Sequence, residues 1–255
     1  MRLVVKLGGS ILEPVPAASL IEALARAAAN GHQVVIVHGG GKALSALLRR
    51  LGIETRFVRG LRVTDTETLR AAVMALAGEV NTTLVGALNR AGVRAVGLTG
   101  LDGACVRARV DRPELGAVGA VSACAPELWL GLLATGFVPT LASIASDGAG
   151  GVLNVNADQF AAACAAALGA DALVFTTDVP GILGGDGVLP RVTLAELDAM
   201  TATGGLHGGM LPKADACRMA LAAGVARVIV VGEAGLEQLD EMIDGEMFAG
   251  TEVLQ

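Results

Sequence analysis

Two lysines next to turn-forming residues are the side chains of this chain best suited to binding an anion. Lys6 ends a short apolar run and is followed by Gly8 and Gly9, which let the backbone approach an anion and aim N–H groups at it. Lys213 follows Pro212 in the first turn of a predicted helix, where a cation opposes the helix dipole. A lysine and a helix N-terminus that face one anion add their fields, which favours phosphate as the ligand. A solvated surface lysine and an ordinary tight turn are the structural alternatives.

A second glycine run follows the next apolar segment of the chain. The β-branched run 33–37 is typical of a buried strand, and glycines fill positions 39–41. This run is not the phosphate loop of the P-loop proteins, because Ile36 stands where that motif needs glycine and no serine or threonine follows Lys42. The GxGxxG motif follows none of the predicted strands, so a dinucleotide-binding dehydrogenase is poorly supported. The two glycine runs together therefore favour a phosphate site of another kind.

Several polar residues could complete such a site. Asp158 opens a predicted helix, where an acid also serves as a cap, and Asn154 and Asn156 offer amide donors and acceptors just before it. Arg62 could hold a carboxylate with its guanidinium fork, although an isolated arginine is as often an ordinary surface residue. His38 is expected to be structural or to form a hydrogen bond beside the glycine run, since no second histidine is placed to share a metal.

The elements that must position these residues alternate between strands and helices. Such alternation predicts an α/β fold, a three-layer αβα sandwich with a mainly parallel central sheet covered on both faces. Ligands of such sheets bind at the carboxyl ends of the strands, so both glycine runs should lie at one edge. Thr64 and Glu67 resemble a capping box that opens the longest helix, and the Val-rich segment 105–119 favours short hairpin strands. Strands are predicted at 3–7, 33–37, 95–98, 136–144, 172–176, 228–231 and 251–254, and helices at 20–28, 44–51, 66–90, 126–134, 157–169, 194–200 and from 210 onward.

Composition narrows the class of protein. The chain has 255 residues, 53% of them hydrophobic, and a net charge of −6, which argues against a nucleic-acid or membrane partner. Mean hydropathy is +0.61, yet the longest alanine-rich run, 160–170, is well short of the ~20 residues that span a bilayer. Lys6 inside the first apolar run is not compatible with a signal peptide. The four cysteines have no CxxC spacing and are expected to be reduced thiols in a cytoplasmic protein, without a metal site.

Five segments taken together resemble those of the N-acetylglutamate kinases, a branch of the amino acid kinase family. The segments are 6–10, 38–41, 60–65, 154–159 and 209–213, and the resemblance extends from Leu3 to Leu254. The glycine runs are shared across the wider family, whereas the segments around Arg62 and Asn154 are more specific to this branch.

The resemblance implies that ATP, with Mg²⁺ held mainly by the nucleotide, phosphorylates the γ-carboxylate of N-acetyl-L-glutamate in the second step of arginine biosynthesis. It implies an N-terminal lobe, 1–170, for the amino acid and for dimerisation, and a C-terminal lobe, 171–255, for ATP. It also implies a homodimer in which the helix 66–90 takes part, without the arginine inhibition that depends on an extra N-terminal helix. By matching motif, the catalytic residues would be Lys6, Lys213 and Asp158, the substrate-binding residues Gly40, Gly41, Arg62 and Asn154, and the nucleotide- or phosphate-binding residues Gly8, Gly9, Gly39, Asp178 and Gly181.

Two alternatives stay open. A kinase for a carrier-linked aminoadipate or glutamate would share the fold, but an acidic carrier usually needs a basic surface and the net charge here is −6. A non-catalytic amino-acid-binding regulatory module would be favoured by loss of Lys6, Asp158 or Lys213, and all three are present. An acceptor carboxylate is already ionised at neutral pH and needs no general base, in agreement with the residue types found.

Overall fold

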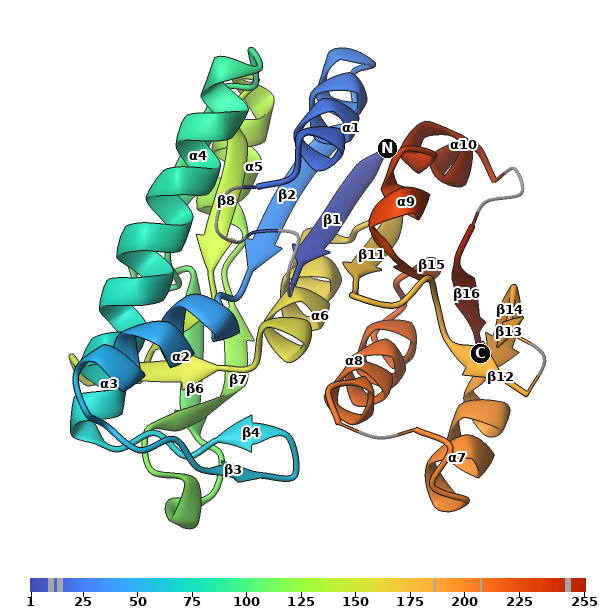
Figure 1. Cartoon of the computed structure of the whole chain (residues 1–255). Coiled ribbons are helices and arrows are strands. Elements are labelled where there is room, and N and C mark those ends of the chain that lie inside the picture. Colours follow the sequence, from blue (N-terminus) through green and yellow to red (C-terminus); the bar gives the residue numbers. More distant parts are fainter. Residues whose placement is uncertain (9–11, 13–15, 186, 207, 246–248) are drawn as a thin grey trace.

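A central eight-stranded sheet organises the computed structural model, which describes residues 1–8, 12, 16–185, 187–206, 208–245 and 249–255 (Figure 1). Its strands are β1 (Arg2–Leu7), β2 (Gln33–His38), β5 (Ala95–Leu98), β8 (Val138–Ala142), β11 (Ala172–Thr176), β14 (Arg191–Thr193), β15 (Arg227–Val231) and β16 (Thr251–Leu254). They lie in the order β14-β16-β15-β11-β1-β2-β8-β5, and only β16 against β15 is antiparallel among these pairs. The predicted mainly parallel sheet is confirmed.

Helices cover both faces of this sheet. Val4 of β1 shares a buried cluster with residues of α5, α6, α7 and α8, whereas Leu3 and Val5 share another with residues of α1, α4, α9 and α10. The three-layer arrangement is therefore confirmed, and burial of β1 on both faces explains its unbroken apolar run. The helices are α1 (Ala18–Ala29), α2 (Gly41–Arg50), α3 (Thr66–Ala72), α4 (Asn81–Arg90), α5 (Glu127–Ala134), α6 (Ala157–Leu168), α7 (Leu194–Ala202), α8 (Met210–Ala222), α9 (Glu233–Leu236) and α10 (Leu239–Asp244).

A small barrel lies beside the main sheet and carries one side of the site. It consists of β6 (Val106–Val110), β7 (Val118–Cys124), β9 (Ile144–Ser146) and β10 (Val152–Val155). The antiparallel pairing of β6 with β7 confirms a hairpin strand within 105–119, but its partner β7 lies mostly beyond that segment, and β9 and β10 were not foreseen. Two short hairpins were also missed, β3 (Phe57–Val58) with β4 (Leu61–Arg62) and β12 (Leu183–Gly184) with β13 (Gly187–Val188).

The long helix predicted over 66–90 forms, with one irregularity. Its middle, Val73–Val80, is π-helical and joins α3 to α4. The predicted cap was wrong, because Asp65 is the cap residue and its side chain accepts a hydrogen bond from the Thr68 N–H at 2.8 Å. Thr64 lies one residue too early and instead pairs with Gly116 in an isolated bridge.

By length and composition this helix could cross a membrane, the sole such helix in the part of the chain described. Half of its most apolar stretch is buried inside the protein, and the long core helices of globular proteins meet the same criterion. The helix is accordingly weak evidence for a membrane span.

Candidate active site

Three loops meet at one edge of the sheet, where adjacent parallel strands end. β1 lies between β11 and β2, with Lys6 level with Phe175 on one side and Val37 on the other. Gly8 comes directly after β1. It therefore lies between the glycine run after β2 and the turn after β11. The prediction that both glycine runs lie at one edge is confirmed for Gly8, whereas Gly9 lies outside the described residues.

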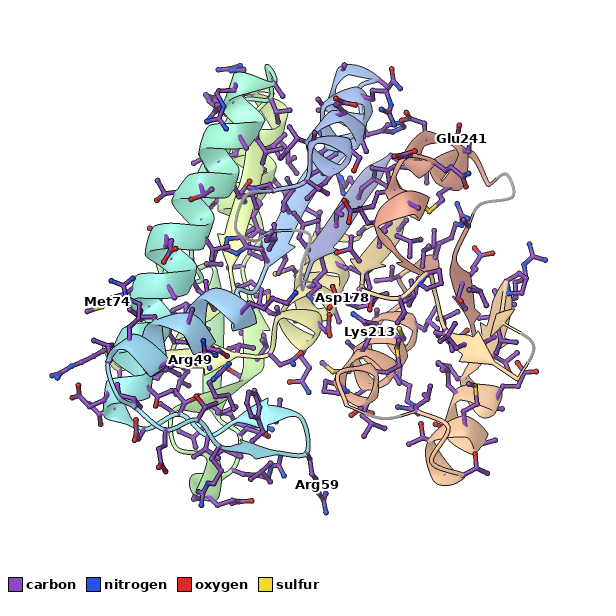
Figure 2. All side chains as sticks on the ribbon, in the orientation of Figure 1. Arg49, Arg59, Met74, Asp178, Lys213 and Glu241 are labelled. Carbon is purple, nitrogen blue, oxygen red and sulfur yellow. The ribbon has the colours of Figure 1, made fainter. Side chains whose placement is uncertain are left out.

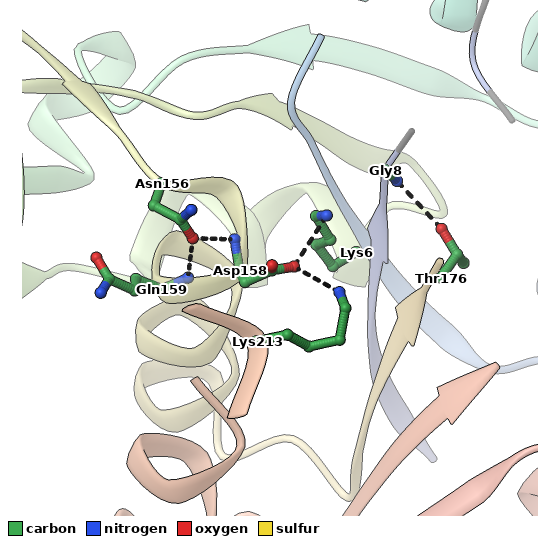
Figure 3. A network of polar contacts seen from close by, with 7 residues as sticks. All are labelled: Lys6, Gly8, Asn156, Asp158, Gln159, Thr176 and Lys213. Carbon is green, nitrogen blue, oxygen red and sulfur yellow. Dashed lines mark hydrogen bonds and ion pairs between the residues drawn. The ribbon is translucent and has the colours of Figure 1, made fainter. Parts of the chain in front are cut away.

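Two ammonium groups meet on one carboxylate at this edge (Figure 3). Lys6 Nζ lies 2.9 Å and Lys213 Nζ 3.1 Å from the same oxygen, Asp158 Oδ1. The three residues are buried, with 8%, 4% and 6% of their surfaces exposed. The expected convergence of the two lysines, more than two hundred positions apart, is thus a feature of the fold.

Each member of this Lys6–Asp158–Lys213 triad comes from a different element. Lys6 shares the face of β1 that carries Val4, so it points toward the layer of α6 and α8. Asp158 lies in the first turn of α6, whose cap Asn156 accepts hydrogen bonds from the Asp158 and Gln159 N–H groups at 3.0 and 3.2 Å. Lys213 lies in the first turn of α8. Both helices therefore begin at the triad.

The electrostatic balance of the triad favours an anionic ligand. Burial by itself would raise the pKa of the Asp158 carboxyl, but the charges of Lys6 and Lys213 lower it to about 2. Burial lowers the pKa of Lys213, and the Asp158 carboxylate opposes that shift. Two ammonium groups and one carboxylate leave one uncompensated positive charge in a water-poor site. An arriving phosphoryl group or carboxylate would compensate it.

Gly8 makes room for the first lysine. A Cβ atom at this position would collide with Nζ of Lys6, so a side chain here would displace the ammonium group. The Gly8 N–H already donates to Thr176 Oγ1 at 3.1 Å, a partner that sequence reasoning missed (Figure 3). The structure thus gives Gly8 a positioning role beside the phosphate contact expected from the sequence.

A cavity of about 220 Å³ extends from the triad toward the barrel. Most of the predicted residues line it, namely Lys6, Gly8, Gly39, Gly40, Gly41, Arg62, Asn154 and Asp158. Sequence reasoning missed further lining residues, namely Leu44, Phe57, Gly60, Leu61, Leu76, Val118, Ser143, Val155 and Ala157. Most of these are apolar. Gly60, Leu61, Val155 and Ala157 lie within the segments 60–65 and 154–159, whereas nothing in the local sequence of the other five distinguishes them from core residues.

Arg62 lines the same cavity from β4. Its Nη2 donates to Gly41 O at 3.2 Å and to Ser45 Oγ at 2.9 Å, and its guanidinium lies 4.6 Å from the ring centroid of Phe57. Asn154 faces the same cavity, and its Nδ2 donates to Thr64 Oγ1 at 3.2 Å. Arg62 is half-buried and held in place, which suits a fork that receives a carboxylate.

The two residues predicted near the nucleotide follow β11 and do not line this cavity. Asp178 is exposed, and Figure 2 labels it together with Lys213. Gly181 is buried, and a Cβ atom there would come within 2.7 Å of Val188 and 2.8 Å of Thr251. Close packing is thus a sufficient reason for glycine at 181, and a nucleotide contact stays a prediction for both positions.

His38 ends β2 and is completely buried beside the glycine run. Its Nδ1 lies 2.7 Å from the Gly39 carbonyl oxygen, and its Nε2 lies 2.8 Å from Asn81 Nδ2. Burial lowers the pKa of His38 to about 4, although the contact with Gly39 opposes the shift. The expected structural role beside the glycine run agrees with this geometry.

The buried imidazole of His38 predicts that the free energy of unfolding depends on pH in the mildly acidic range. Between pH 6.5 and 4 the unfolded chain takes up a proton on His38 and the native protein does not, so the free energy of unfolding falls as the pH falls through this window. We expect a loss of about 2 kcal/mol between pH 7 and pH 5 in urea unfolding. The loss should disappear in His38→Asn, and an equal loss in that variant would contradict the assignment.

Comparison with known proteins places this geometry in a family. The profile of the amino acid kinase family matches residues 1–232. The chain is 46% identical to acetylglutamate kinase of Acidobacterium capsulatum, covering 100% of this chain and 99% of that protein, and 46% identical to acetylglutamate kinase of Solibacter usitatus, covering 96% of each. The crystal structure of smu.665 from Streptococcus mutans superposes with a TM-score of 0.87 at 28% identity, over 99% of this chain and 98% of that one. The chain therefore belongs to the amino acid kinase family, and the curated relatives it resembles are acetylglutamate kinases.

Proposed function

We propose that this protein is an acetylglutamate kinase, which transfers the γ-phosphoryl group of ATP to the γ-carboxylate of N-acetyl-L-glutamate in arginine biosynthesis. The observation that carries the proposal is the meeting of Lys6 and Lys213 on Asp158 at the end of a glycine-lined cavity. Relatives of this name at 46% identity over nearly the whole chain support it.

The main difficulty of this reaction is the approach of two anions. The acceptor carboxylate, with a reference pKa near 4.3, is ionised at neutral pH, so no base has to remove a proton. An acceptor oxygen forms a bond to phosphorus while the bond to the ADP oxygen breaks and its electron pair leaves with ADP. Lys6 and Lys213 would offset the charge on the transferring phosphoryl group, and Asp158 would hold both ammonium groups in place.

The remaining cavity residues would bind the amino acid. Arg62 and Asn154 would hold the substrate carboxylate that does not react, with Gly40 and Gly41 close to the acceptor. Gly8, Gly9 and Gly39 would contact phosphates, with Asp178 and Gly181 near the nucleotide. In this assignment residues 1–170 form the lobe that binds the amino acid, and 171–255 form the lobe that binds ATP.

The residues of the site fit a metal that arrives with the nucleotide. Among the described residues no group of three His, Cys, Asp or Glu side chains could hold a metal ion, and Asp158 Oδ1 already receives two ammonium groups. Mg²⁺ is commonly held by one or two carboxylates, water and substrate phosphates. When bound, Mg²⁺ would neutralise part of the phosphate charge, and Asp178 is the exposed carboxylate nearest in sequence to the end of β11.

A cytoplasmic homodimer completes the proposal, with the long helix at its interface. Met74 projects from the π-helical segment with 61% of its surface exposed, and Val73 beside it is 36% exposed (Figure 2). Light scattering on the eluting protein should give twice the mass of the 25.5 kDa chain. Met74→Glu should shift the protein toward the monomer, and a hexameric mass would contradict the arrangement.

Purified protein should release ADP with N-acetylglutamate far faster than with glutamate or aminoadipate. Saturable turnover that requires N-acetylglutamate would support the proposal. Preference for a carrier-linked substrate would favour the related carrier-dependent kinase. Binding of the amino acid without any ADP release would favour a regulatory module instead.

A further inference from the structure

We propose that His38, held by Asn81, is a positioning residue that fixes the peptide between Gly39 and Gly40 so that the Gly40 N–H faces the cavity. The inference rests on the proposed function in one respect, that the ligand there is an anion that receives this N–H. Neither side chain contacts the Lys6–Asp158–Lys213 triad in the described part of the chain, and neither takes part in the chemistry above.

The hydrogen bonds determine which nitrogen of His38 carries the proton. A carbonyl oxygen only accepts, so the 2.7 Å contact with Gly39 O requires a proton on Nδ1. Asn81 Nδ2 donates both of its protons, one to Nε2 at 2.8 Å and the other to Thr140 O at 2.9 Å. Gly97 leaves room for this amide, because a Cβ atom there would collide with Asn81 Oδ1. The imidazole is therefore neutral, and Asn81 locks its tautomer.

The direction of one carbonyl fixes the direction of the next N–H. In a trans peptide the C=O of Gly39 and the N–H of Gly40 point to opposite sides. Because His38 is completely buried and draws the Gly39 carbonyl toward itself, the Gly40 N–H is directed away from the interior. A peptide between two glycines has the least steric resistance to flipping, since neither residue carries a Cβ atom. The histidine supplies the restraint that the glycines lack.

The surroundings of Gly40 are consistent with an N–H that donates to a ligand in the cavity. Gly39 and Gly40 line the cavity, and Gly40 is the cap residue of α2. No hydrogen bond among the described residues uses the N–H of Gly40 or Gly41. A flipped peptide would place the Gly39 carbonyl toward an anion and so oppose binding. The hydrogen bond from His38 to Gly39 O thus keeps the Gly40 N–H available as a donor at a helix N-terminus, where an anion is favoured.

Kinetics of four proteins test the proposal. His38→Phe keeps a ring and removes the donor, and we expect kcat to fall about 30- to 100-fold with the KM values changed less than about threefold. His38→Asn restores an amide donor near the Nδ1 position and should recover at least about tenfold of that loss. Thr140→Val removes a buried hydroxyl beside Asn81 without touching Gly39, so its kcat should stay that of the wild type. Thermal unfolding of each variant separates lost stability from lost turnover.

A kcat of His38→Phe within about threefold of the wild type would overturn the inference, as would equal rates for the Phe and Asn variants. A second readout does not depend on activity or on any variant. Nitrogen NMR of the labelled wild type, which has three histidines, should show one imidazole with the proton on Nδ1 between pH 6 and 8. A proton on Nε2 of His38 would overturn the inference even if the protein phosphorylates a different acceptor, and absence of turnover with N-acetylglutamate would overturn only the proposed function.

Discussion

Replacing Lys213 with alanine should lower kcat by about 10²- to 10³-fold while the KM for N-acetylglutamate changes less than about threefold. The reason is the position of the ammonium group. Lys213 Nζ meets Asp158 at the triad, whereas Arg62 donates to Gly41 O and Ser45 Oγ, beside the place where the substrate carboxylate would bind. The charge of Lys213 would therefore matter most in the transition state, when negative charge moves from the acceptor oxygen to the leaving ADP oxygen across the phosphoryl group. Initial rates over a grid of both substrate concentrations measure the two parameters.

Arg62→Met is the matched control for this prediction. It removes a half-buried positive charge from the same cavity, one that would bind the unreactive carboxylate. We expect the opposite pattern, a KM for N-acetylglutamate raised by about 10-fold or more and a kcat within a few-fold of the wild type. If Lys213→Ala had an unchanged kcat, Lys213 would have no part in the transfer. If both variants changed only KM, both residues would serve binding alone.

The convergence of the site was predictable because parallel strands constrain where their ends lie. The apolar runs before Gly8 and Gly39 identify two buried strands, and adjacent parallel strands end at one edge of the sheet. Lys213 was recognisable because a cation in the first turn of a helix opposes the dipole and needs a reason to be there. Local sequence therefore sufficed for the parts of the site that follow directly from a strand end or a helix start.

The side of the sheet toward which Lys6 points could not be predicted in the same way. β1 is buried on both faces, so its residues show no alternation that would assign Lys6 to the α6 and α8 side. The cap of the long helix shows a similar limit. Thr64 and Asp65 are adjacent and both can cap, and the bridge between Thr64 and Gly116, which are far apart in sequence, helps leave Asp65 in the capping position. Tertiary contacts of this kind have no local sequence signal.

His38 illustrates the same limit for function. His38 was expected to be structural or to form a hydrogen bond beside the glycine run, but no local pattern indicates Asn81, 43 positions later, as its partner. That pairing depends on how α4 packs on β5 and β8, the strands next to β2, and the close approach of Gly97 to Asn81 depends on the same packing. A role that passes through a partner from another element becomes visible only in three dimensions.

Asp158→Asn is the single substitution expected to cost the most stability. It leaves Lys6 and Lys213 buried beside each other without a counter-charge, and breaking a buried ion pair in this way typically costs about 3–5 kcal/mol. Urea unfolding at pH 7 measures the loss. Turnover should fall at the same time by at least about 10²-fold, because both ammonium groups lose the negative charge that positions them.

A second substitution distinguishes charge repulsion from lost packing. The double variant Lys6→Met with Asp158→Asn removes one of the two ammonium groups that repel each other. It should therefore unfold at a higher urea concentration than Asp158→Asn alone, although it stays inactive. Burial already lowers the pKa of Lys213, and loss of the Asp158 carboxylate, which opposes that shift, lowers it further. Below the unfolded pKa of lysine the unfolded chain then binds more protons than the native variant, so with rising pH the stability of Asp158→Asn should rise more steeply than that of the wild type in the range below that pKa. A single variant as stable as the wild type, or a double variant less stable than the single one, would mean that the carboxylate does not hold the two lysines together by charge.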